Sequence, residues 1–334
     1  MDTSQPICMV RDSKEVRPLR NEEQNLISGF LLCGEGYGDM ICMIPTVEKT
    51  AHQLGRSLDV WTKRPEVFAN IPSLRPKMSD DTELENYLAN GHLLIVCPVR
   101  FDPSPKWNQA HLAVRPAGGI VQLDDADKEV RLYATDLDRA TAAQLLAPLE
   151  AVSKVVIHPN RNRPVRTWPS DRWRELALGL LEQGIGVVAV GRDVPNLAHT
   201  EENIPKGVFD LGIKHECFLD LTEHTSLHVL YEVINACDVA ITFDSGVLHV
   251  ANCTETPIVA LFSDNDPDFF TRIRAGKPGA GTFAAYRPCP TQFCQTWHGA
   301  WSNCLQESDQ HMCCLPSVQQ VLDAVMAFLG KTSV

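Results

Sequence analysis

The sequence predicts an α/β fold made of two halves, each built on a parallel sheet. Short apolar runs alternate with segments of helical periodicity, an order typical of parallel strands joined by helices. The pattern restarts after residue 150, and a chain of 334 residues is expected to hold one or two domains. We therefore expect one domain at 1–150 and a second at 151–334.

The first half opens with a polar segment and then alternates between strands and helices. The expected elements are an arm or edge strand at 1–25, a strand at 27–33, a helix at 40–55, strands at 58–62 and 92–99, and loops at 100–135. The helix has apolar residues at helical spacing and ends at Gly55. Frequent Pro and Gly residues favour loops in the last segment.

The second half repeats the alternation. The expected elements are helices at 139–150, 170–184, 226–237 and 318–329, and strands at 155–159, 186–191 and 239–243. Ser170 is suited to cap the amino end of its helix, and Gly184 is suited to the position that follows it.

Composition limits the classes of partner and compartment. The net charge of −12 argues against a broad nucleic-acid surface, although a local basic cleft is compatible with it. No apolar run reaches the length of a membrane span, and the first twenty residues lack the pattern of a signal peptide. Several of the 12 cysteines lie within expected strands and helices, as buried thiols do in a reducing compartment. We expect a cytoplasmic protein.

The most informative segment is 241–262, ITFDSGVLHVANCTETPIVALF. An apolar run ends at Asp244, Ser245 and Gly246, a short segment with His249 follows, and a second apolar run completes a strand, turn, helix and strand. Such a turn lies at the carboxyl end of a strand, where ligands bind in open α/β sheets and where a helix start favours anions. A nucleotide diphosphate is the expected occupant. Ser245 lacks the GxSxG setting of a nucleophile, and His249 is either structural or a donor to phosphate.

Two further loops follow expected strands. Residues 158–169 hold Arg163 and Arg166, whose guanidinium groups suit phosphate oxygens, although a solvated basic loop explains them equally well. Residues 34–39, GEGYGD, permit a tight turn and a close approach of a ligand to the backbone. Their spacing differs from the dinucleotide fingerprint, so a plain strand-to-helix turn is the simpler interpretation. Asp39 nevertheless lies where a first-turn carboxylate can act as a general base.

Thiols gather before the last expected helix. The cluster comprises Cys289, Cys294, Cys304, Cys313 and Cys314, with His298 and His311 nearby in sequence. Such a group can bind zinc or iron, but the gaps lack the paired CxxC of a standard site, so free thiols are the alternative interpretation.

Four segments, in order, resemble glycosyltransferase family nine, the ADP-heptose heptosyltransferases. They are GYGDMICMIPTVEKTA, RTWPSDRWRELALGLLEQGIGVVAVGRD, DLTEHTSLHVLYEVINACDVAITFDSGVLHVANCTETPIVALF and the cysteines before the last helix. The resemblance runs from about Phe30 to Leu329 and implies the GT-B architecture: two Rossmann-like domains facing across a cleft, with a C-terminal helix crossing back to the first domain. The first domain would bind the acceptor and the second the nucleotide sugar.

The resemblance also implies an inverting sugar transfer that needs no catalytic metal. Asp39 would be the general base, and Gly36 and Gly38 would lie in an acceptor or cleft loop. The diphosphate would be bound by Arg163, Arg166, Asp244, Ser245, Gly246 and His249, and the nucleoside by Gly191, Arg192 and Asp193. Candidates for a structural zinc or iron are Cys289, Cys294, Cys304 and Cys313.

The acceptor stays open at the level of sequence. ADP-heptose is the expected donor, and the acceptor is a lipopolysaccharide core sugar, a protein side chain or a hydroxylated DNA base. Two other classes are a non-catalytic nucleotide-sugar-binding protein, against which Asp39 argues, and an epimerase of the same architecture.

Overall fold

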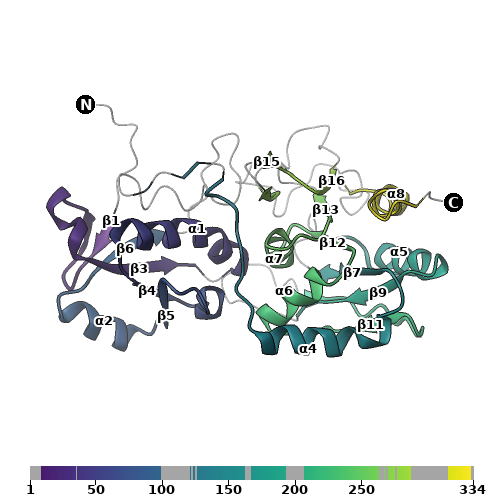
Figure 1. Cartoon of the computed structure of the whole chain (residues 1–334), viewed down its shortest axis with the longest axis horizontal. Coiled ribbons are helices and arrows are strands. Elements are labelled where there is room, and N and C mark those ends of the chain that lie inside the picture. Colours follow the sequence, from purple (N-terminus) through teal and green to yellow (C-terminus); the bar gives the residue numbers. More distant parts are fainter. Residues whose placement is uncertain are drawn as a thin grey trace. The chain divides into compact units, whose positions relative to one another are not determined.

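The computed structural model describes residues 9–34, 36–98, 121, 123–124, 126–161, 167–192, 207–262, 267, 270–274, 277–286 and 315–331. Contacts divide the chain into two compact units. The first comprises Met1–Tyr133 with Arg272–Ala280, and the second comprises Ala134–Thr271 with Gly281–Val334. Each unit is built on a mainly or wholly parallel sheet, which confirms the predicted α/β class (Figure 1).

The sheet of the first unit has the strand order β2-β1-β6-β3-β4-β5. Its strands are β1 (Met9–Arg11), β2 (Val16–Pro18), β3 (Ile27–Cys33), β4 (Leu58–Thr62), β5 (Leu74–Met78) and β6 (Leu93–Pro98). Strands β6, β3, β4 and β5 are parallel, whereas β1 is antiparallel to both β2 and β6. Strand β4 is buried along its whole length, as expected of a parallel strand covered on both faces.

Within the described ranges of the first unit, two α-helices cover this sheet. The first unit contains η1 (Asn21–Leu26), α1 (Tyr37–Leu54), η2 (Pro65–Phe68), α2 (Asp81–Ala89) and a small ladder of β14 (Ile273–Arg274) with β15 (Lys277–Pro278). The chain moves along the sheet in one direction through α1 and returns through α2, so right-handed crossovers place the two helices on opposite faces (Figure 1). Helix α1 ends, as predicted, at Gly55 in the left-handed conformation.

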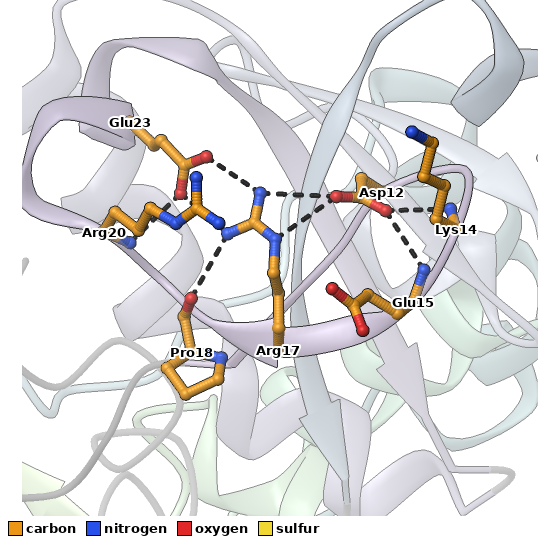
Figure 2. Close-up of polar contacts among 7 residues, drawn as sticks. All are labelled: Asp12, Lys14, Glu15, Arg17, Pro18, Arg20 and Glu23. Carbon is orange, nitrogen blue, oxygen red and sulfur yellow. Dashed lines mark hydrogen bonds and ion pairs between the residues drawn. The ribbon is translucent and has the colours of Figure 1, made fainter.

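The expected polar arm contains an antiparallel hairpin, β1 and β2, tied together by Arg17. Figure 2 shows its guanidinium group between two carboxylates. It donates two hydrogen bonds of 2.8 Å to Glu23 and one of 3.3 Å to Asp12. The hydrogen bonds from Arg17 hold the pKa of the Glu23 carboxyl below its usual value, and the backbone N–H of Lys14 does most to lower that of Asp12.

The sheet of the second unit is parallel throughout, with the order β11-β9-β7-β12-β13-β16. Its strands are β7 (Lys154–His158), β9 (Gly186–Ala189), β11 (Phe218–Asp220), β12 (Val239–Phe243), β13 (Ile258–Phe262) and β16 (Thr282–Tyr286). A separate short ladder joins β8 (Asn160–Arg161) to β10 (Gly207–Val208). Strands β7 and β12 are neighbours although about 80 residues separate them in the sequence.

Helices cover both faces of the second sheet. They are α4 (Asp136–Leu146), η3 (Ala147–Leu149), α5 (Ser170–Glu182), α6 (Leu227–Asn235), α7 (Gly246–Asn252) and α8 (Val318–Phe328). Helix α5 packs against α8, and α6 contacts both α4 and α7. The chain moves in opposite directions along the sheet through α5 and α6, so these two helices lie on opposite faces.

Several details differ from the sequence-based expectations. Helix α5 is capped by Pro169, and Ser170 is its first residue. Helix α8 packs on α5, β13 and β16 and belongs to the core of the second unit. The division between units falls after Tyr133, because α4 packs on α6. In the described ranges, every helix is too short or too polar to cross a bilayer.

Candidate functional site

Polar residues gather at the carboxyl edge of the second sheet. His158 ends β7, Gly191 lies just beyond β9, and Asp244 and Ser245 follow β12. Thr242 of β12 stands in register opposite His158 on the neighbouring strand. Because parallel strands present their carboxyl ends at one edge, these residues meet where ligands bind in open α/β sheets.

Three of these residues form a hydrogen-bonded triangle. The Nδ1 atom of His158 lies 3.2 Å from Oγ of Ser245 and 3.3 Å from Oγ1 of Thr242. The two hydroxyl oxygens are 3.3 Å apart, and the Thr242 hydroxyl also donates to the carbonyl oxygen of Phe243 across 3.0 Å. The triangle joins the ends of two strands to the turn that precedes α7.

Burial keeps the His158 ring neutral. The residue is 8% exposed, and removal from water lowers the pKa of its imidazole from 6.5 to about 3. A neutral ring has one nitrogen that donates and one that accepts, so Nδ1 makes a single directional bond toward the hydroxyl groups beside it.

Gly191 provides the room that the ring needs. Its φ of +138° favours glycine, and a Cβ atom added there would lie 2.8 Å from Cδ2 of His158 and 2.3 Å from Cγ1 of Val208. The Gly191 carbonyl oxygen accepts the backbone N–H of Glu223 across 3.0 Å, and Glu223 pairs with the exposed Arg192 at 3.3 Å. The ends of β9 and β11 are therefore held together beside the triangle.

The segment after β12 forms the strand, turn and helix that the sequence predicts. Asp244 is buried, Ser245 is half-buried, and Gly246, the first residue of α7, is exposed to solvent. His249 is buried in the same helix, with its ring edge-on to Phe270 at a centroid distance of 6.1 Å. These residues present one polar turn above a buried apolar strand.

In the first unit, Asp39 lies in the first turn of α1 and is half-buried. Gly36 is the N-cap of that helix, and a Cβ atom added to it would lie 2.7 Å from Oδ2 of Asp39. The next residue, Tyr37, donates its hydroxyl proton to Glu66 across 2.6 Å, and the Arg64 guanidinium lies 4.6 Å from the centre of the Tyr37 ring. The carboxylate is thus placed by a glycine turn at the carboxyl end of β3.

The structure brings together some of the residues that the sequence analysis singled out. Gly191, Asp244, Ser245, Gly246 and His249 belong to the second unit, and Gly36, Gly38 and Asp39 to the first. Arg163, Arg166, Asp193, Cys289, Cys294, Cys304 and Cys313 lie outside the described residues. Within the described part of the chain, His, Cys, Asp and Glu side chains form no group that could hold a metal ion.

His158 and Thr242 are not among the candidate residues that the sequence predicts. The expected strand at 155–159 contains His158, but the prediction of phosphate binding rests on the arginine loop that follows it. Two signals were available: the polar residue at each strand end, and a parallel order that brings such ends to one edge. What the sequence did not provide was the adjacency of β7 and β12.

Comparisons with known proteins agree on one family. The model of glycosyltransferase family 9 (heptosyltransferase) matches residues 115–294, which is more than half of the chain. Lipopolysaccharide heptosyltransferase 2 of Salmonella typhimurium is 32% identical over 107 residues, which cover 32% of this chain and 29% of that protein. The match therefore spans less than a third of the curated relative.

Solved structures show the same fold. A family 9 glycosyltransferase from Veillonella parvula superposes with a TM-score of 0.62 and 15% identity, covering 90% of this chain and 97% of that one. The ADP-heptose lipopolysaccharide heptosyltransferase II of Escherichia coli gives a TM-score of 0.59 and 16% identity, with 91% and 98% covered. At these identities the likeness shows the GT-B fold.

Proposed function

The chain belongs to glycosyltransferase family 9, the heptosyltransferases, and on this basis we propose that it transfers a heptose from ADP-heptose to an acceptor hydroxyl with inversion of configuration. The observation that carries the proposal is the polar turn Asp244-Ser245-Gly246, at the carboxyl edge of the second sheet beside His158 and Gly191. This turn lies inside the segment that matches the family.

The proposed donor site belongs to the second unit. Ser245 and Gly246 bind the diphosphate through hydroxyl and backbone N–H groups, and the buried His249 stands one helical turn further along. Arg163 and Arg166 add charge that suits phosphate oxygens. Gly191, Arg192 and Asp193 bind the nucleoside at the end of β9.

The proposed base, Asp39, belongs to the first unit. As the acceptor oxygen attacks the anomeric carbon, its O–H bond breaks and the proton passes to the Asp39 carboxylate. The bond from the anomeric carbon to the diphosphate breaks on the opposite face, and its electron pair leaves with ADP. Hydrogen-bond donors and positive charges of the protein stabilise the charge that develops on the diphosphate, so the proposed transfer needs no catalytic metal ion.

The acceptor that we propose is a sugar of the lipopolysaccharide core, because the curated relative is named for transfer to lipopolysaccharide. A protein side chain and a hydroxylated DNA base are the other acceptors to be tested. A structural zinc or iron at the cysteine cluster remains a prediction from sequence.

Two measurements test this function. The first is thermal stabilisation by ADP, UDP and GDP, since a ligand that binds the folded state raises its stability. A preference for ADP supports the donor, and a clear preference for UDP contradicts it. The second is ADP release from ADP-heptose with each class of acceptor. Binding of ADP-heptose without turnover on any of them would indicate a non-catalytic binding protein, and rearrangement of the sugar without an acceptor would indicate an epimerase.

The base is tested by Asp39→Asn, with Asp171→Asn as the matched control in the first turn of α5. We expect Asp39→Asn to lower kcat by at least about a hundredfold while ADP binding is unchanged. Full activity of Asp39→Asn would show that another group takes the proton.

A further inference from the structure

The Ser245 hydroxyl is directed away from the helix that Ser245 caps. An N-cap serine usually accepts a hydrogen bond from a backbone N–H in the first turn of its helix. Within the described part of the chain, the Ser245 side chain makes no such bond to α7. Its Oγ atom lies instead 3.2 Å from Nδ1 of His158 and 3.3 Å from Oγ1 of Thr242.

The chemistry of a diphosphate decides where the protons of this triangle must lie when it is bound. Phosphate oxygens only accept hydrogen bonds, so the Ser245 hydroxyl must keep its proton for the ligand. The His158 ring is buried and neutral and carries one proton. With that proton on Nδ1, the ring donates to Oγ of Ser245 across 3.2 Å and leaves the Ser245 O–H to donate to the diphosphate, while the Thr242 hydroxyl donates to the Phe243 carbonyl oxygen across 3.0 Å.

The position of the histidine is itself fixed on several sides. His158 ends a buried strand opposite Thr242, and its ring lies against the Cβ-less Gly191. A histidine ring with restricted rotation loses less rotamer freedom when it forms a hydrogen bond than a flexible surface side chain does. It therefore holds its partner in place at a lower entropic cost.

Resting on the proposed donor site, we propose that His158 is a positioning residue that fixes the Ser245 hydroxyl for contact with the diphosphate of the nucleotide sugar. Without the ligand, the Ser245 O–H can point toward Oγ1 of Thr242, which lies 3.3 Å away. His158 acts through Ser245 and makes no contact of its own with the sugar or the reacting atoms.

Three substitutions at one position test this role. In His158→Asn the side-chain amide can occupy the place of Nδ1, in His158→Gln it reaches instead toward the place of Nε2, and His158→Leu removes both. We expect His158→Asn to keep the affinity for ADP within about twofold, and the other two to weaken it about five- to tenfold, the range of one neutral hydrogen bond. Binding is measured by titration calorimetry with ADP, and the KM for the donor is measured alongside kcat.

A double-mutant cycle separates positioning from a general structural effect. In a Ser245→Ala background, His158→Leu should change ADP affinity by less than about twofold, because the partner through which it acts is gone. Effects that multiply in the double variant would overturn the proposal. Equal losses of ADP affinity in His158→Asn and His158→Gln would also overturn the proposal. If His158→Leu fails to fold, the comparison of these two variants is sufficient to test it.

The cycle also distinguishes this inference from the proposed function. If Ser245→Ala binds ADP and turns over the donor as the unsubstituted protein does, the proposed donor site is wrong, whatever His158 does. If Ser245→Ala is impaired and the His158 effects are independent of it, the donor site stands and the positioning role fails.

Discussion

Trp168 donates its indole N–H to the carbonyl oxygen of Pro316 across 3.0 Å, a contact between residues 148 positions apart. Arg172 donates to the same oxygen across 2.9 Å. Trp168 is fully buried and meets the ring of Trp173 edge-on at 4.9 Å. The contact fastens the start of α5 to the segment that leads into α8, and so helps to close the core of the second unit.

We predict that this bond contributes measurably to stability. Trp168→Phe should lower the free energy of unfolding by about 1 kcal/mol more than Trp173→Phe, because both lose similar volume but only the first loses a hydrogen bond. Among the described residues, the indole N–H of Trp173 has no hydrogen-bond partner. Urea denaturation of the two variants provides the comparison. Equal losses of stability would show that the hydrogen bond from Arg172 alone satisfies the Pro316 carbonyl oxygen.

Gly36 should control the direction of the Asp39 carboxylate. The backbone at Gly36 has φ −76° and ψ 134°, which alanine adopts without strain, but its Cβ would lie 2.7 Å from Oδ2 of Asp39. We expect Gly36→Ala to lower kcat by about ten- to a hundredfold with little change in Tm. Gly179→Ala, where the new Cβ would meet Leu322 at an ordinary 3.4 Å, is the control in steady-state assays. Unchanged kcat in Gly36→Ala would contradict this control of the carboxylate, whereas the role of Asp39 itself is tested by Asp39→Asn.

The buried His158 should make the protein less stable in mild acid. Its pKa is 6.5 in the unfolded chain and about 3 in the folded one, so only the unfolded chain takes up a proton as the pH falls below 6.5. The stability that His158 contributes is therefore complete above pH 6.5 and is lost toward pH 3, by up to about 1.4 kcal/mol per pH unit. Between pH 7.5 and pH 5, the unsubstituted protein should lose about 2 kcal/mol more than His158→Asn in urea unfolding. Parallel pH profiles for the two proteins would mean that the ring is not buried in its neutral form.

Gly191 should be intolerant of any side chain. Its φ of +138° and the approach of Val208 and His158 leave no room for a Cβ, so Gly191→Ala should cost about 2–4 kcal/mol and weaken ADP binding. Gly184→Ala is the matched control, since it also has a positive φ, of 70°, but its Cβ would point into open space. Thermal unfolding of both variants separates the cost of the steric clash from the cost of the positive φ. If Gly191→Ala loses no more stability than Gly184→Ala, the residues around Gly191 readily rearrange.

Local sequence patterns predicted individual helices and strands better than they predicted which of these elements are neighbours in space. The run from Ile241 to Phe262 is apolar, polar and apolar in turn, and it folds as predicted into β12, α7 and β13. Strand β5 was missed, because LRPKM combines a proline and two basic residues with only two apolar ones and therefore lacks the usual strand pattern. The last helix was expected at 318–329 and spans Val318–Phe328.

The site illustrates the same limit. Asp244, Ser245 and Gly246 were recognised because they are consecutive and end an apolar run. His158 was passed over because its partners are 84 and 87 residues away, and strand order decides whether such residues meet. The order of strands is set by the packing of the whole sheet, and it cannot be predicted from any short segment of the sequence.

The hairpin of β1 and β2 has a consequence for the behaviour of the protein in concentrated solution. Without it, β6 would be the border of the first sheet, with a row of unpaired backbone groups open to strands of other chains. The hairpin pairs with β6 and presents in its place a strand of three residues that contains Arg17 and Pro18. A strand so short, charged and interrupted by proline is a poor template, so the hairpin that Arg17 holds together also protects the molecule against edge-to-edge aggregation.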